Sequence, residues 1–245
     1  MLFQTLLIIC SILAVLISFS RKKEPFKTEQ HYSAYGSEHS IVYDSLVYDG
    51  LKNENELAFL QHTLTTSSNV LDVGCGTGHH VNALHERGVN AVGVDISSDM
   101  IAIAKKRYSH DFFQGNALST ALFQQETFTH ILCMYFTIYC MKHKEQFFKN
   151  AYEWLMSEGY IALHVSEKWD YGPTSSFKGN FSYKKTHSRE LITVDGKNKR
   201  IEHRIYMEPI SSIINMAKQS GFIVSSVYAY DVPYKGQFLY VLFKP

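Results

Sequence analysis

Three glycines at alternate positions follow a short apolar run, and this pattern constrains the fold more than any other feature of the sequence. The run covers residues 70–73, and Gly74, Gly76 and Gly78 come directly after it. A short apolar run before a turn is typical of a buried strand, and residues 79–87 have the pattern of a helix. Alternate glycines let the backbone turn sharply and let a ligand approach it closely. The segment therefore predicts a strand, turn and helix with a ligand site where the strand ends.

Strand-like and helix-like segments alternate along most of the remaining chain. Predicted strands cover residues 70–73, 91–94, 111–114, 129–135, 160–165, 222–230 and 238–243, and predicted helices cover 53–65, 79–87, 98–108, 144–156 and 210–220. The last two strands have no helix between them and must be antiparallel, because a parallel crossover needs about a dozen residues. We expect an α/β fold with a mostly parallel seven-stranded sheet, an antiparallel last strand and helices on both faces.

One block, residues 167–208, interrupts the alternation. Asp195 and Gly196 form a hairpin turn signal between the strand-like segments 191–194 and 201–206. We expect a β-hairpin insertion after the fifth strand. It is either an exposed elaboration, a cap over a substrate, or a basic face directed toward an anionic membrane.

The first twenty residues have the composition of a membrane segment. Residues 2–19 carry no charge, and three basic residues follow at 21–23. At about 1.5 Å per residue, such a helix is just long enough for a bilayer core. The basic flank predicts a single-pass transmembrane helix at 1–20 with the folded domain in the cytoplasm. A cleaved signal peptide is the alternative, because residues 18–20 loosely imitate a cleavage site.

The rest of the chain divides into a short segment and one domain. Residues 21–52 form a linker or a tyrosine-rich lid, and residues 53–245 form the domain. Hydrophobic residues make up 45% of the chain, which is enough for a sizeable core. The net charge of +1 argues against a dedicated nucleic-acid binder. The four cysteines show no paired spacing, as expected for a reducing compartment.

Two carboxylates accompany the glycine turn. Asp95 ends the second predicted strand, where it can accept hydrogen bonds from vicinal ribose hydroxyls. Asp72 precedes the first glycine by two residues, where it would repel a pyrophosphate but favour an ammonium group. A dinucleotide site needs Gly-x-Gly-x-x-Gly, and here the third glycine comes one residue too soon. The pattern therefore disfavours a nicotinamide-dependent oxidoreductase.

The glycine turn and the acid at the end of the second strand resemble the first motifs of class I S-adenosylmethionine-dependent methyltransferases. The residues that carry this resemblance are Asp72-Val73-Gly74-Cys75-Gly76-Thr77-Gly78 and Asp95. The resemblance covers about residues 53–245 and implies a Rossmann-like fold with S-adenosylmethionine as cofactor. The cofactor-binding residues that it implies are Asp72, Gly74, Cys75, Gly76, Gly78, Asp95, Ile96, Met100, Asn116, Ala117 and Met134.

The resemblance also implies a role for each group of residues. The glycines admit the aminoacyl part of the cofactor, and Asp72 organises the loop or contacts the ammonium group. Asp95 holds the ribose, and Ile96 and Met100 flank the adenine. Asn116 and Ala117 lie where the family contacts the adenine amine, and Met134 approaches the methionine portion.

Two departures from the family pattern are visible. Thr129-His130 stands where the fourth strand often begins with Phe-Asp, and residues 157–159 replace a common Pro-Gly-Gly. No catalytic residue is assigned; the candidate bases are Tyr135, Tyr139, His164, Glu167, Tyr35 and Tyr43. Adjacent histidines such as His79 and His80 point in different directions on a helix, so no metal site is expected.

The implied activity is methyl transfer to an unidentified acceptor. No Asn-Pro-Pro-Tyr-like tetrapeptide follows the fourth strand, which disfavours amide and base-amine acceptors. The pattern resembles the family's broad small-molecule branch, and the membrane segment favours a lipid-soluble or membrane-associated acceptor. One alternative is methylation of protein or RNA gripped by the basic insertion. Another is a catalytically inactive cofactor-binding or membrane scaffold protein.

Overall fold

The computed structural model describes Ser40, Tyr43, Asp44 and residues 47–167, 181–186, 189–194, 200–231 and 233–245. Between 181 and 204 it describes the backbone only. The predicted anchor at 1–20 and most of the predicted linker at 21–52 lie outside these residues. Within the described part of the chain, every helix is too short or too polar to cross a bilayer.

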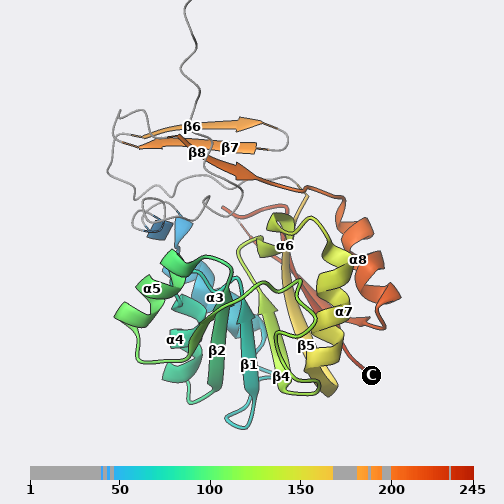
Figure 1. Cartoon of the computed structure of the whole chain (residues 1–245). Coiled ribbons are helices and arrows are strands. Elements are labelled where there is room, and N and C mark those ends of the chain that lie inside the picture. The colour runs from blue at the N-terminus through green and yellow to red at the C-terminus, as the bar shows by residue number, and fades with distance from the viewer. Residues whose placement is uncertain are drawn as a thin grey trace, which may run out of the picture.

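Seven strands form the central sheet in the order β3-β2-β1-β4-β5-β10-β9 (Figure 1). Their bounds are β1 (Asn69–Val73), β2 (Asn90–Asp95), β3 (Phe112–Gln114), β4 (Phe128–Cys133), β5 (Leu155–Ser166), β9 (Ile223–Ala229) and β10 (Gln237–Phe243). Strands β1 to β5 pair in parallel, whereas β10 runs antiparallel to both β5 and β9. The expected mostly parallel sheet with an antiparallel last strand is confirmed.

Helices cover both faces of this sheet (Figure 1). They are α3 (Gly50–Phe59), α4 (His79–Glu86), α5 (Ser98–Arg107), α6 (Thr137–Cys140), α7 (Lys144–Trp154) and α8 (Ile210–Gln219). Apolar residues of α3, α4 and α5 form one buried cluster with the sheet, and those of α6, α7 and α8 form a second. Burial of each large apolar side chain contributes about 1.5–3 kcal/mol to the stability of the fold. The two clusters therefore fix the sheet from both sides.

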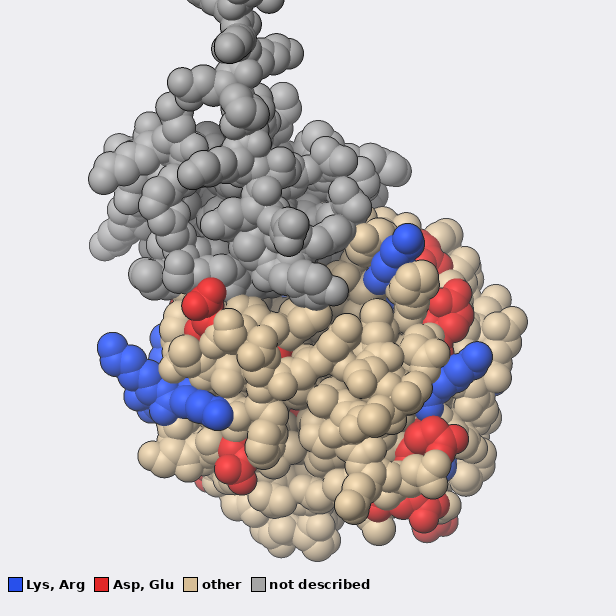
Figure 2. Space-filling view, viewed as in Figure 1, with Lys and Arg blue, Asp and Glu red and all other residues tan. Residues whose placement is uncertain are grey.

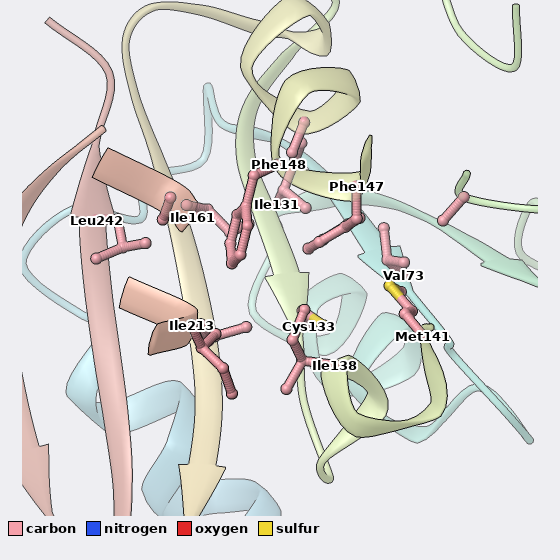
Figure 3. Packing of buried hydrophobic residues seen from close by; sticks show 14 of the residues in the cluster. Val73, Ile131, Cys133, Ile138, Met141, Phe147, Phe148, Ile161, Ile213 and Leu242 are labelled. Atoms are coloured by element: carbon pink, nitrogen blue, oxygen red, sulfur yellow. The ribbon is translucent and has the colours of Figure 1, made fainter. Parts of the chain in front are cut away.

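The second cluster fixes the position of α6 (Figure 3). Ile138 of α6 packs with Cys133 of β4, Phe147 of α7 and Ile213 of α8 in this cluster. The turn of residues 134–136, between β4 and α6, is consequently held at both of its ends.

Several elements differ from the sequence prediction; α3, for example, ends at Phe59 instead of residue 65, and β5 begins at Leu155 instead of residue 160. Helix α3 begins at Gly50 instead of residue 53, because the Asp49 side chain accepts hydrogen bonds from the amides of Leu51 and Lys52 and caps the helix. Helix α6 was not predicted, since four residues are too few for a helical period to be visible.

The predicted β-hairpin insertion is larger than expected. Strands β6 (Phe181–Thr186), β7 (Arg189–Val194) and β8 (Arg200–Arg204) form an antiparallel three-stranded sheet. The pairing of β7 with β8 agrees with the prediction, whereas β6 was missed, and the predicted turn at Asp195 and Gly196 lies outside the described residues. In Figure 1 the small sheet lies beyond the carboxyl ends of β1 and β4, and the glycine turn follows β1 at this edge.

Charged side chains lie mainly toward the margins of the described surface in the view of Figure 2, and the centre of this face is uncharged. Inside the domain, by contrast, Lys52, Glu56, Asp72 and Lys144 are all buried. Buried charges are costly unless they are paired, so these residues call for a structural or functional explanation.

Candidate functional site

A cavity of about 360 Å³ opens where β1 and β2 end. The predicted site residues that line it are Gly74, Gly76, Asp95, Ile96, Met100, Asn116 and Ala117. They come from three successive strand ends, which a parallel sheet brings to one edge. The predicted constellation is therefore assembled around a single cavity.

Asp95 is the best-placed polar group in the cavity. One carboxylate oxygen accepts a hydrogen bond from the Gly76 amide (3.0 Å), and the other accepts one from the Ser97 amide (2.8 Å). Burial raises the pKa of Asp95, and these two amides oppose the shift. Each oxygen keeps a further lone pair that a hydroxyl of a ligand can use. Asp95 thus fixes the glycine loop and still presents acceptors to the cavity.

The three glycines serve different purposes. All have positive φ, at 72° for Gly74, 52° for Gly76 and 89° for Gly78. Among the described residues, a Cβ on Gly76 would meet only Tyr43, at 3.7 Å, so this residue leaves space for a ligand. A Cβ on Gly78 would lie 2.7 Å from the Phe112 ring. Gly78 lines neither this cavity nor the smaller one described next, and the close packing of Phe112 of β3 and Ala104 of α5 on it explains why a glycine stands here.

A smaller cavity of about 30 Å³ lies beneath the glycine loop. Asp72, Cys75 and Met134, which the resemblance also implied, line this cavity. The Asp72 side chain is buried, and burial raises its pKa to about 6. Its Oδ2 atom and the Oδ1 atom of Asn53, in the same cavity, find no hydrogen-bond partner among the described residues. Two acceptors without donors mark a place for a group that donates hydrogen bonds.

Asn116 has a partner that the sequence did not indicate. Its side-chain oxygen accepts a hydrogen bond from the Leu118 amide at 3.0 Å, which shapes the loop after β3. The side-chain nitrogen is a donor, and the oxygen retains a second lone pair. Asn116 can therefore form the wall of the cavity and still offer polar contacts.

The segment before α3 closes one side of the cavity. The Asp44 carboxylate accepts a hydrogen bond from the Thr77 hydroxyl (2.6 Å) and pairs with His79 (3.2 Å) and Arg107 (2.5 Å). These contacts hold the pKa of Asp44 at about 2, although burial alone would raise it. Tyr43, the neighbour of Asp44, lines both cavities. Residues 43 and 44 thus lie against the glycine loop, whereas most of the segment predicted as a linker or lid lies outside the described residues.

One wall of the cavity was not predicted from the sequence. It consists of Thr137, Cys140, Met141, Lys142, His143 and Tyr206. The buried Lys144 joins the two parts of this wall by donating hydrogen bonds to the carbonyls of Met141 (3.0 Å) and Tyr206 (2.8 Å). Tyr206 follows β8, so the insertion returns its chain to the site. No sequence motif marks these residues, although an apolar and aromatic run after β4 was a usable signal.

Of the six candidate bases, three lie away from the cavity, Tyr43 and Tyr135 line it, and Tyr35 lies outside the described residues. Tyr139 donates a hydrogen bond to the Ser166 carbonyl (2.9 Å), His164 is buried beside Gln237, and Glu167 is exposed in a groove beside α8. Tyr135 does line the cavity, but it donates to the Asp49 carbonyl (3.0 Å), and burial raises its pKa further from neutrality.

The part of the chain that the structure describes contains no group of three or more residues suited to hold a metal ion. The two adjacent histidines have separate partners. His79 pairs with Asp44, and His80 is hydrogen-bonded to Glu56 at 2.8 Å.

Known proteins resemble this chain in both sequence and fold. Residues 70–159 match the family model described as a methyltransferase domain. A protein of Geobacillus sp. (strain WCH70), named "Putative methyltransferase GWCH70_2453", is 30% identical over 148 residues, or 53% of this chain. That match spans only 57% of the Geobacillus protein.

Two solved structures show the same architecture. The CcbJ methyltransferase from Streptomyces caelestis has a TM-score of 0.66 at 17% identity, over 85% of this chain and 97% of its own. A S-adenosylmethionine-dependent methyltransferase from Clostridium acetobutylicum has a TM-score of 0.64 at 15% identity, over 84% and 98%. The chain has a methyltransferase fold. The solved structures show the fold, the family match covers residues 70–159, and both are consistent with S-adenosylmethionine as the cofactor.

Proposed function

We propose that the protein binds S-adenosylmethionine in the two cavities on either side of the glycine loop and transfers its methyl group to an acceptor. The observation that carries the proposal is the pair of carboxylates beside that loop. Asp95 faces the larger cavity, and Asp72 faces the smaller one. A nucleoside joined to an amino acid has hydroxyl and ammonium donors at its two ends, and these match the two carboxylates.

The residues present fit this cofactor. An ammonium group can donate three hydrogen bonds, and it would satisfy the unpartnered oxygens of Asp72 and Asn53. Its positive charge would also restore the ionised form of Asp72, whose pKa burial raises to about 6. At the other end, Ile96 and the buried Met100 offer apolar surface for a purine ring.

S-adenosylmethionine supplies an electrophilic methyl group on a sulfonium, whose sulfur leaves as a neutral thioether. The protein then has no leaving group to protonate, and positioning and exclusion of water supply most of the acceleration. Asp95 and the loop amides would orient the nucleoside, while Tyr43, fastened by Asp44, would cover the loop. A general base is needed only for a weakly nucleophilic acceptor such as a hydroxyl.

For the acceptor, we favour a small molecule or a lipid. Support comes from the uncharged stretch at residues 2–19, which would tether the domain to a membrane from the cytoplasmic side. Further support comes from Tyr135 and Tyr206, amphipathic side chains that line the cavity beside the glycine loop. We expect no specific nucleic-acid partner.

The activity is tested by incubating the full-length protein with S-adenosylmethionine labelled on the methyl group. Cell extracts separated into lipid, small-molecule, protein and RNA fractions serve as acceptors. We expect label in the lipid or small-molecule fraction, and much less label with a D95A variant at the same cofactor concentration. Label in protein or RNA, with activity that falls steeply with salt, would favour those acceptors instead. Cofactor binding without label in any fraction would point to the inactive scaffold.

The membrane tether has a separate test. The full-length protein is expressed, membranes are washed with high salt and with carbonate, and the protein is traced. Retention in the membrane after both washes is expected for a spanning helix, whereas release by carbonate is expected for a peripheral protein. A variant with Leu13, Leu16 and Ile17 changed to Gln serves as the matched control.

A further inference from the structure

The turn between β4 and α6 is strained. Tyr135 and Phe136 have φ values of 45° and 64°, in the left-handed region that side chains with a Cβ rarely adopt. Two such residues in succession cost free energy and persist only where the surrounding structure enforces them. Strain of this kind collects at functional sites, so the groups that enforce this turn bear on the function of the site.

This turn shapes the cofactor cavity directly. Tyr135 lines both the larger and the smaller cavity. Thr137, the next residue after Phe136, packs so closely on the glycine loop that a Cβ on Gly74 would lie 2.4 Å from its methyl group. A relaxation of the turn would therefore displace a wall of the cavity and the support of Gly74 together.

A buried ammonium group lies against the turn. The Nζ atom of Lys52 is 4.8 Å from the centre of the Tyr135 ring and 4.9 Å from that of Phe136. Tyr230 and Tyr234 complete a cage of four aromatic rings, at 5.7 and 5.1 Å. All four distances are within the range of cation–π attraction, which is stronger when the cation is removed from water.

The rest of the cage fixes Lys52 in place. Its Nζ atom donates a hydrogen bond to Gln237 Oε1 at 3.0 Å, and Gln237 is also hydrogen-bonded to His164 at 3.1 Å. Glu56, one helical turn after Lys52, is hydrogen-bonded to His80 (2.8 Å) and accepts from Tyr230 (3.1 Å). The ammonium group thus contacts Gln237 of β10 directly, while His164 of β5 and His80 of α4 hold its neighbours Gln237 and Glu56.

Fold stability does not explain this lysine. Only 4% of Lys52 is exposed, and burial lowers its pKa to about 8, with Glu56 and Asp49 opposing the shift. A lowered pKa means that the charged form is disfavoured in the folded protein. The charge therefore lowers the stability of the fold. Its position against Tyr135 and Phe136 indicates a role in shaping the turn instead.

We propose that Lys52 is a positioning residue whose buried ammonium group holds Tyr135 and Phe136 in the strained turn that walls the cofactor cavity. The inference rests on the proposed function, because the wall matters only if the cavity binds the cofactor. This role differs from that of a residue of the hydrophobic core, because replacing a core residue would lower the stability of the fold and the affinity for the cofactor together.

The test uses K52M in the full chain, because methionine keeps the length and removes the charge. Calorimetry measures S-adenosylmethionine binding, a thermal scan measures Tm, and hydrogen exchange of the ligand-free protein follows residues 134–140. We expect at least tenfold weaker binding, faster exchange confined to this segment, and a Tm that is unchanged or higher. K52R should recover part of the affinity, and K218M, at an exposed lysine on α8, should match the wild type.

Several outcomes would overturn the inference. Binding by K52M within twofold of the wild type would do so, and so would a joint loss of affinity, Tm and protection throughout the chain. If the wild type itself fails to bind S-adenosylmethionine, the proposed function is wrong. Hydrogen exchange at residues 134–140 in K52M then still tests whether Lys52 holds the turn. If K52M does not fold, Q237M removes the hydrogen-bond acceptor of Lys52 and should loosen the same segment; unchanged exchange there overturns the inference.

Discussion

The Asp44 carboxylate accepts a hydrogen bond from the Thr77 hydroxyl at 2.6 Å, which joins the segment before α3 to the glycine loop. Replacing Asp44 by Asn removes a charge that also pairs with His79 and Arg107. Because hydrogen bonds to charged groups contribute about 1.5–3 kcal/mol, we expect S-adenosylmethionine to dissociate roughly tenfold faster or more. Stopped-flow displacement measures the rate. D111N, at an exposed aspartate, is the control, and an equal rate in D44N and wild type would show that the segment does not close the cavity.

Asp95 connects the glycine loop to the larger cavity. We expect D95A to weaken S-adenosylmethionine binding by about 1.5–3 kcal/mol, since a charge-assisted acceptor of ribose and of the Gly76 amide is lost. Calorimetry measures the affinity, with D99A as the control, at a half-buried aspartate in the first turn of α5 that lines neither cavity. Unchanged affinity in D95A would remove this residue from the site.

Gly76 and Gly78 should respond differently to a side chain. G76V fills the space between the loop and Tyr43, so we expect cofactor binding to be lost. Its stability should fall by only about 1–2 kcal/mol, the cost of left-handed backbone. In G78A the new Cβ would collide with the Phe112 ring, so stability should fall more than in G76V. Urea unfolding and calorimetry separate the two effects, and the reverse order would contradict this assignment.

Asp72 should release a proton when the cofactor binds below pH 7. Burial raises its pKa to about 6 in the free protein, and an adjacent ammonium group would lower it again. Affinity should therefore fall as the pH drops below about 6, where the free carboxyl is protonated. Calorimetry at about pH 6 in buffers of different ionisation enthalpy measures the proton. D72N should bind more weakly and lack this proton release; if wild type also shows none, Asp72 does not face the ammonium group.

Lys52 should make stability depend on pH on the alkaline side. Its folded pKa of about 8 lies below the unfolded value of 10.5, so between these values the unfolded chain binds more protons. Stability then rises with pH across this window, by up to about 3 kcal/mol. The penalty is fully present below about pH 8. Denaturant unfolding of wild type and K52M at about pH 7 and pH 10 gives the difference, and parallel curves would refute the assignment.

The sequence predicted the sheet and the glycine loop well because both depend on local pattern. The short apolar strands, the glycines and Asp95 lie within about thirty residues, and parallel pairing brings their ends together. The antiparallel last strand also followed from a local feature, the short connection between β9 and β10.

The remaining walls of the site were not predictable, because they depend on contacts between distant segments. Lys52 looks like an ordinary surface residue of an amphipathic helix, and only the fold reveals Gln237, 185 residues away, as its partner. Lys144 likewise meets Tyr206 across 62 residues. Gly78, in contrast, was predicted to contact the ligand because of its place in the motif. In the structure, the close Phe112 ring explains why this position has no side chain.

Strand β10 lies between β5 and β9, and its first residue, Gln237, contacts Lys52 near the start of the domain. During synthesis, the gap beside β5 is filled only after residues 237–243 have left the ribosome. A growing chain thus contains the glycine loop long before it contains Gln237, which contacts Lys52 beside the turn of residues 134–136. If the cavity binds S-adenosylmethionine as proposed, a product of interrupted translation without residues 237–243 would lack Gln237 and, with it, the hydrogen-bond acceptor of Lys52.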